Sequence, residues 1–195
     1  MVDVLSVISQ TVKELAYFEA EVSWVYEHLV RPNLGRQEPE FMKTNFTDTI
    51  YGYVMRAFSF LDLFSAYWDG LNNPDSQTER MISFMRQYLD FPDTESRVAV
   101  KLWRHTLMHT AQARIIVDSK AGVTYAWLLV WTSEETTDRP LRIVDKKLHM
   151  CLILFLRALK AGVDRYYEGL PIDPQMQDRA RAALSKLDAK ADLFG

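Results

Sequence analysis

Cysteine and glycine are scarce in this chain, and each scarcity excludes a class of protein. A single cysteine among 195 residues, Cys151, excludes a disulfide framework and paired-cysteine metal motifs, and it favours a reducing compartment. Seven glycines favour helices over a β protein with many turns. Because 48% of the residues are hydrophobic and five are tryptophans, the chain can fill a sizeable core. We therefore expect a single domain over residues 1–195.

Long apolar runs and an excess of basic charge are also absent. The longest apolar run, residues 150–156, lies between Lys147 and Arg157 and is far shorter than the ~20 residues that span a bilayer. The first segment carries acids from Asp3 onward, unlike a secretory signal peptide. A net charge of -3 and a pI near 5.8 argue against a surface that coats nucleic acid, but they allow a local cationic site. We expect a cytoplasmic protein that binds no membrane.

The spacing of apolar residues predicts a helical bundle. Apolar side chains recur at intervals of three and four along most of the chain, which is the period of one helical face. The predicted helices cover residues 4–29, 41–68, 77–89, 95–118, 145–167 and 174–193. The helix at 95–118 should have Asp93 or Thr94 as its N-cap and Glu95 in its first turn, and it should end before a left-handed Gly122.

One segment departs from the helical pattern. The stretch "GVTYAWLLVWT" is β-branched and aromatic, "LRIVD" alternates, and the polar "SEETTDRP" connects them. We predict a β-hairpin of residues 123–131 and 141–144, packed on the helices because a lone hairpin is only marginally stable. The expected fold class is therefore mostly all-α, a helical bundle with a small β-hairpin insertion at about 123–144.

The stretch "LWRHTLMHT" brings Arg104, His105 and His109 together in the helix predicted at 95–118. On a helix that turns 100° per residue, the two histidines lie about 40° apart, whereas Arg104 and His109 lie about 140° apart. Histidines at this spacing could bind a metal. The motif, however, supplies neither a third ligand nor the glutamate of a helical His-Glu-x-x-His site. We therefore predict no metal and no other cofactor.

Phosphate chemistry suits these side chains better. Histidine moves a proton near neutral pH, and an arginine offers fixed donors to a phosphate that gains charge in the transition state. In RNA the 2′-hydroxyl already lies beside the scissile phosphate, so a base, an acid and a charge stabiliser suffice without a metal. The segment is also locally cationic, because residues 97–120 contain five basic residues and one acid, Asp118.

The segment "RHTLMH", residues 104–109, resembles the signature of HEPN domains (higher eukaryotes and prokaryotes nucleotide-binding). That signature is an arginine, then Asn, Asp or His, with a histidine four to six residues after the arginine. The order of helices is similar too: a long aromatic helix, the short "RMISFMRQYLDF", the motif helix and a long closing helix, which together cover about residues 41–167. This chain has histidine after the arginine, where asparagine is typical.

The resemblance implies an all-α bundle, a homodimer that brings two motifs together and, in many members, metal-independent endoribonuclease activity, often as a toxin or antiviral effector. Arg104 and His109 would be the catalytic residues, with Arg104 on the scissile phosphate and His109 as general base or acid. His105, Lys101 and Arg97 would bind substrate or orient a partner. Because Arg104 and His109 do not share a face, the site would be composite across a two-fold axis. The expected partners are a second copy, an RNA or nucleotide, and an antitoxin-like protein.

A structural interpretation of the same residues stays open. Asp62 lies inside the aromatic stripe "FSFLDLFSAYWDG" and needs a partner there, which Arg104 or a motif histidine could supply. His109 could be a polar residue that is hydrogen-bonded between helices. The chain would then be a non-catalytic HEPN-like module that binds a nucleotide or a protein partner.

Overall fold

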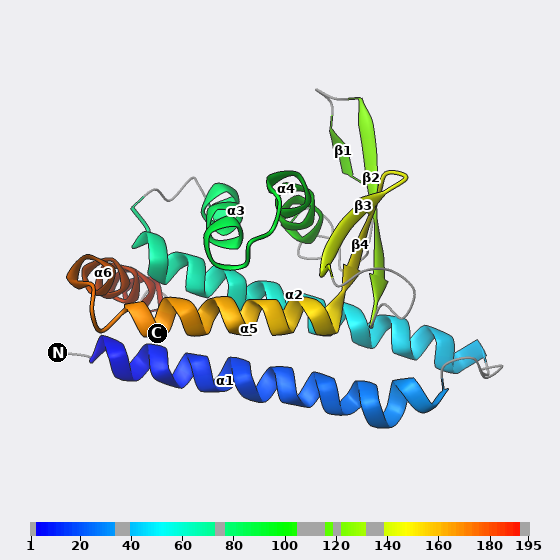
Figure 1. The fold of residues 1–195 in the computed structure, drawn as a ribbon, viewed down its shortest axis with the longest axis horizontal. Helices are drawn as coiled ribbons and strands as arrows, with labels where there is room; N and C mark the ends of the chain where they lie inside the picture. The colour runs from blue at the N-terminus through cyan, green and yellow to red at the C-terminus, as the bar shows by residue number, and fades with distance from the viewer. Residues whose placement is uncertain are drawn as a thin grey trace.

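The computed structural model describes residues 3–33, 40–72, 77–104, 116–118, 122–131 and 139–191. The fold is mostly helical with one small sheet, as predicted from the apolar spacing (Figure 1). The α-helices are α1 (Val4–Val25), α2 (Glu40–Asp69), α3 (Gln77–Tyr88), α4 (Asp93–Leu102), α5 (Leu152–Gly169) and α6 (Pro174–Ala191). The strands are β1 (Ile116–Asp118), β2 (Val123–Val130), β3 (Leu141–Val144) and β4 (Lys147–Cys151). A π-helical turn, η1 (Tyr26–Val30), and a 3-10 turn, η2 (Arg31–Asn33), follow α1.

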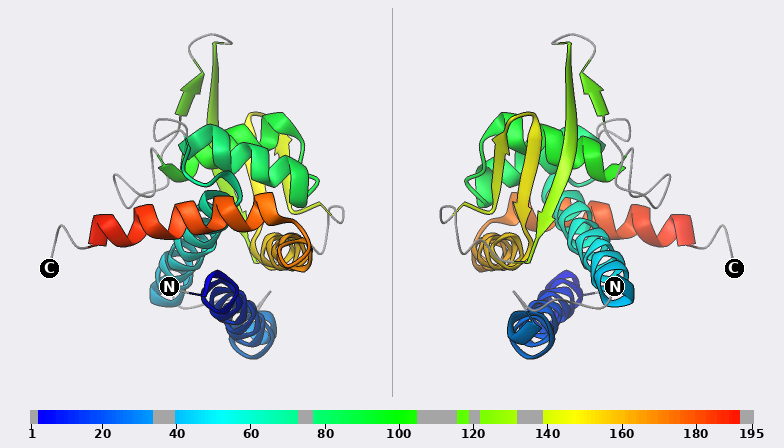
Figure 2. Two further views of the ribbon diagram at one scale, coloured as in Figure 1. Left: turned by 90° about the vertical axis from the view of Figure 1, so that its left-hand side faces the viewer. Right: turned by 90° about the vertical axis from the view of Figure 1, so that its right-hand side faces the viewer.

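Three long helices, α1, α2 and α5, lie side by side and α6 crosses one of their ends (Figures 1 and 2). The α3–α4 pair and the sheet lie on the far side of α2 and α5 from α1. No helix within the described ranges combines the length and apolar character needed to cross a membrane.

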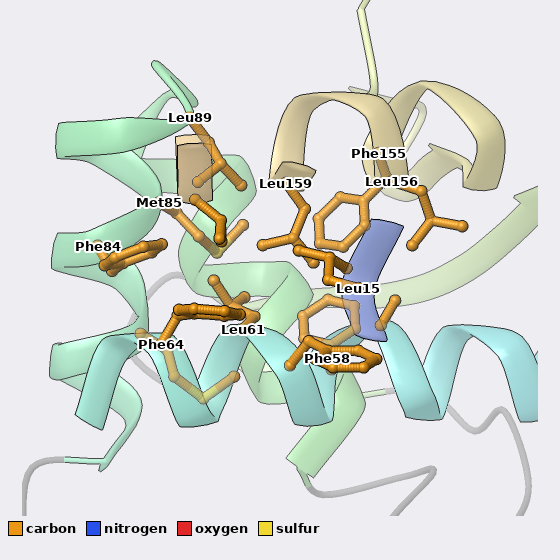
Figure 3. Packing of buried hydrophobic residues seen from close by; sticks show 14 of the residues in the cluster. Leu15, Phe58, Leu61, Phe64, Phe84, Met85, Leu89, Phe155, Leu156 and Leu159 are labelled. Carbon is orange, nitrogen blue, oxygen red and sulfur yellow. The ribbon is translucent and has the colours of Figure 1, made fainter. Parts of the chain in front are cut away.

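The core forms where the apolar faces of these helices meet. In α1, Ile8, Leu15, Phe18 and Val22 are fully buried, as the three-and-four spacing predicts. Figure 3 shows Leu15 among side chains from α2, α3 and α5. The buried hydrophobic residues form one cluster that includes residues of the sheet as well as of the helices. The bundle and the sheet are therefore packed around a common core.

The predicted hairpin of residues 123–131 and 141–144 is wrong in its pairing. The sheet order is β1-β2-β4-β3, so β4 lies between β2 and β3 and runs parallel to β2. β3 instead pairs antiparallel with β4 through a two-residue turn, Asp145 and Lys146, whose φ angles are 47° and 64°. Two positive φ angles are the geometry of a tight hairpin turn of type I′. Neither residue is a glycine, so this turn has little signal in the sequence.

The predicted start of the fifth helix at residue 145 is also wrong. Residues Lys147–Cys151 form β4, and α5 begins only at Leu152. The apolar run 150–156 continues through the end of the strand and the start of the helix. An unbroken apolar run looks the same in a buried strand and a buried helix, so periodicity could not separate the two.

The motif helix is shorter than the predicted 95–118. α4 begins at Asp93 with Pro92 as its N-cap, so neither Asp93 nor Thr94 caps it. It ends at Leu102, and residues 103 and 104 continue as a π-helical turn. The last predicted residues, Ile116–Asp118, form β1, consistent with the β preference of isoleucine and valine. Gly122 has the expected positive φ of 64°, but it directly precedes β2.

Candidate functional site

The candidate site lies where the C-terminal end of α4 meets the first turn of α3. Trp103 is buried and its ring stacks on Phe58 of α2, with 5.6 Å between the ring centroids, which anchors the end of α4 in the core. The next residue, Arg104, is half-buried. Its Nη1 donates a hydrogen bond to the Thr78 hydroxyl at 3.1 Å. The guanidinium is therefore held by a neutral partner from the neighbouring helix.

The charge of Arg104 is available to an anion. Neither Arg104 nor Lys101 forms an ion pair with any acid in the ranges that the structure describes. The carbonyl groups at the end of a helix carry partial negative charge, which favours a cation at this position. On a helix, residues 97, 101 and 104 fall within about 60° of one face. Arg97, Lys101 and Arg104 therefore form one row of cations along α4 and the π-helical turn that follows it.

Arg97 differs from the other two cations because acids already hold it. Its guanidinium donates to both carboxylate oxygens of Glu79, at 2.5 and 3.1 Å, and its Nε lies 3.6 Å from the Asp93 carboxylate. The hydrogen bond to Glu79 raises the pKa of Arg97 above its ordinary value. Arg97 would have to give up these partners to bind a phosphate. Of the three predicted cations, it is therefore the least suited to substrate.

Asp62 pairs with Arg80, whereas Arg104 binds Thr78. Arg80 Nη2 lies 2.7 Å from the Asp62 carboxylate, and Gln77 donates to the other carboxylate oxygen at 2.8 Å. The proposed pair between Arg104 and Asp62 is therefore wrong. The sequence places Arg80 one helical turn before the buried Phe84, on the apolar face of α3, but this position alone does not identify it as the partner of Asp62.

The first turn of α3 positions the cations of α4, and sequence reasoning missed this role. Thr78 binds Arg104 and Glu79 binds Arg97, while Gln77 and Arg80 bind Asp62 of α2. Four consecutive side chains thus fix α3 to both of its neighbours. The sequence offers no signal for this bridge, since it depends on how α3 and α4 pack.

Two of the predicted site residues, His105 and His109, lie outside the described residues, as does the whole range 105–115. The structure therefore places Arg97, Lys101 and Arg104 and brings them onto one face. Among the side chains that the structure does describe, no group of three or more histidines, cysteines or acids could hold a metal ion.

A cavity of about 460 Å³ lies away from these cations, between the loop from α3 to α4, the start of β3 and α5. Its lining is mainly apolar, with Asp90 and Arg139 as its charged members. Arg165 holds the Asp90 carboxylate at 2.9 Å. This cavity offers apolar contact but few side chains that could take part in a reaction.

Comparison of the chain with protein-family models, curated proteins and solved structures found no match in any of the three. Function is therefore inferred from the residues of the site and from the sequence motif.

Proposed function

We propose that the chain is a HEPN-like, metal-independent endoribonuclease in which Arg104 binds the scissile phosphate. One observation carries the proposal. The Arg104 guanidinium is half-buried, is held by the neutral Thr78 hydroxyl, and has no acid partner in the described ranges. A fixed and uncompensated guanidinium is what a phosphate needs when it gains charge in a transition state.

The cleavage step needs few other groups. His109 takes the proton from the ribose 2′-hydroxyl, and the 2′-oxygen forms a bond to phosphorus. The bond from phosphorus to the 5′-oxygen breaks, and that oxygen gains a proton from water. The products are a 2′,3′-cyclic phosphate and a 5′-hydroxyl end. Arg104 stabilises the charge on the phosphate oxygens throughout, so the step requires no metal ion.

The site is composite, with Arg104 from one copy and His109 from a second. In the ideal helix that the sequence predicts for the motif, the two residues are about 140° apart, which is too far for one helix to present both to one phosphate. A two-fold axis through the motif region would bring them together twice. Lys101 would hold a flanking phosphate, and His105 would orient a neighbouring group. An RNA-cleaving protein of this kind would act in the cytoplasm as a toxin or defence component, held in check by an antitoxin-like partner.

The test is cleavage of labelled, mixed-sequence RNA by the purified protein in excess EDTA. We expect cleavage with 2′,3′-cyclic phosphate ends, and we expect Arg104→Ala and His109→Ala each to slow it by about 100-fold or more. Arg86→Ala is the matched control. Arg86 belongs to the same helix pair, is exposed and pairs only weakly with Asp93 at 3.3 Å, so its loss should leave the rate unchanged.

Three results would count against the proposal. Cleavage that EDTA abolishes, or that Arg104→Ala leaves intact, would exclude the metal-free mechanism built on Arg104. A folded protein that binds RNA through Arg104 without cutting it would support the non-catalytic binding module instead.

A further inference from the structure

Helix α1 exposes large aromatic side chains on the face that points away from the bundle. Tyr17 is 74% exposed and Trp24 is 55% exposed. Ala20 is exposed between them, and residues 17, 20 and 24 share one side of a helix. We call Tyr17, Ala20 and Trp24 the α1 stripe. The His28 ring stacks on Trp24, with 4.7 Å between the ring centroids, and extends the stripe by one turn.

The α1 stripe plays no part in the core. The opposite side of α1 buries Ile8, Leu15 and Phe18, and α1 packs mainly against α5. In Figures 1 and 2, α1 forms the outer edge of the molecule, with the other helices on one side of it. Neighbouring exposed aromatics on a soluble surface commonly mark a contact with another molecule.

We propose that the α1 stripe is the docking site for α1 of a second copy of this chain, in antiparallel orientation. The charges on α1 select this partner. Lys13 and Glu27 each lie seven positions from Ala20, on opposite sides of it, and both are exposed. A two-fold axis at Ala20 places Lys13 opposite Glu27 of the second copy, and the symmetry repeats this pair. A parallel arrangement would instead oppose like charges, lysine to lysine and glutamate to glutamate.

The other side chains near the axis fit the same arrangement. Tyr17 would face Trp24 of the second copy, which allows two aromatic contacts. The small Ala20 lets the two backbones approach closely at the axis. Glu21 would lie near Glu21 of the second copy. Arg56 of the same chain, however, lies 3.4 Å from the Glu21 carboxylate and offsets its charge.

This interface is separate from the composite site. α1 and α4 lie on opposite sides of the layer formed by α2 and α5 (Figures 1 and 2). Pairing through α1 leaves the cations of α4 open, so the inference does not depend on the proposed ribonuclease function. If both contacts form, the chain assembles beyond a dimer.

The first test compares molecular masses by size-exclusion chromatography with light scattering at micromolar concentration. We expect the mass of Tyr17→Glu/Trp24→Glu to be half that of the unchanged protein or less. Ile172→Glu is the control, because Ile172 is 83% exposed and lies far from α1 in the chain. Its mass should match that of the unchanged protein. Equal masses for all three proteins would overturn the inference.

The second test fixes the orientation by cross-linking. Ala20→Cys lies on the proposed axis and should form a disulfide between two copies under mild oxidation, whereas the native Cys151 is buried. Ser6→Cys is the control, because an antiparallel pair would separate the two introduced thiols by about 40 Å. Cross-linking of Ser6→Cys, or none of Ala20→Cys, would exclude the antiparallel pair.

Charge reversal tests the pairing of Lys13 with Glu27. Lys13→Glu and Glu27→Lys should each weaken the self-association several-fold, and the double variant should restore it because both pairs are re-formed with opposite polarity. Glu27 also pairs with Arg31 at 2.8 Å within its own chain, but both side chains are about half exposed and that pair contributes little to folding. A double variant weaker than both single variants would show that the two residues do not meet.

Discussion

Asp62 and Arg80 show at the scale of single residues how a charge is accommodated in an apolar layer. The Arg80 side chain is 6% exposed and that of Asp62 is 29% exposed. Arg80 Nε also donates to the Ser65 hydroxyl at 3.2 Å, and that hydroxyl donates to the Asp62 carbonyl oxygen at 2.7 Å. The pair therefore has its hydrogen bonds satisfied, and it ties α2 to α3 beneath the candidate site.

Asp62→Ala should lower the free energy of unfolding by about 3 kcal/mol, because it leaves the Arg80 guanidinium buried without its carboxylate. Asp178→Ala is the comparison. Asp178 pairs with Arg181 at a similar 2.7 Å, but both side chains are at least half exposed, so its loss should cost less than about 1 kcal/mol. Urea unfolding of both variants measures the difference. Equal losses of unfolding free energy would show that the buried pair of Asp62 and Arg80 contributes no more to stability than the exposed pair.

The sequence correctly indicated that Asp62 needs a partner, but it could not name one. The sequence contains several arginines that could pair with Asp62. Which of them does so depends on how α3 packs on α2. The same limit applies to Thr78, whose contact with Arg104 follows from the packing of α3 on α4. The sequence thus showed that a residue needs a partner, but it did not show which residue of another element supplies that partner.

At the scale of elements, the long amphipathic helices and the strands β2 and β3 could be predicted, whereas the strands β1 and β4 could not. The period of apolar residues identifies α1 and α2 within a few residues of their ends. β4 was missed because its apolar sequence runs directly into α5, and β1 because a helical pattern was extended over its three residues. The pairing of β2 with β4 joins two segments that are not adjacent in the sequence, so local sequence patterns do not predict it.

The close packing of α5 on the end of α3 gives a prediction at this scale. A Cβ atom at Gly162 would lie 2.8 Å from both the Tyr88 carbonyl oxygen and the Leu89 side chain. Gly162→Ala should therefore destabilise the protein by about 1 to 3 kcal/mol, despite the better helix propensity of alanine. Gly52→Ala in α2 is the matched control.

A Cβ at Gly52 meets nothing within 4 Å, so alanine there should stabilise the protein by up to about 1 kcal/mol. Thermal or urea unfolding of the two variants should thus give shifts of opposite sign. A stabilised Gly162→Ala variant would contradict the packing of α5 against α3.

At the scale of the whole molecule, the sequence predicted a helical bundle with a small β element, and the structure has both. The composite site that we propose would be a property of two copies, so neither one sequence nor one chain can display it. In this proposal Arg104 and His109 act across chains.

The most direct measurement of that claim mixes two inactive variants. Arg104→Ala and His109→Ala chains are combined in equal amounts, allowed to exchange, and assayed for RNA cleavage in excess EDTA. Half of the dimers should be mixed, and each mixed dimer should hold one site with both residues, so activity should return to about a quarter of that of the unchanged protein. If the unchanged protein cleaves RNA but the mixture is no more active than either variant, Arg104 and His109 do not act across two chains.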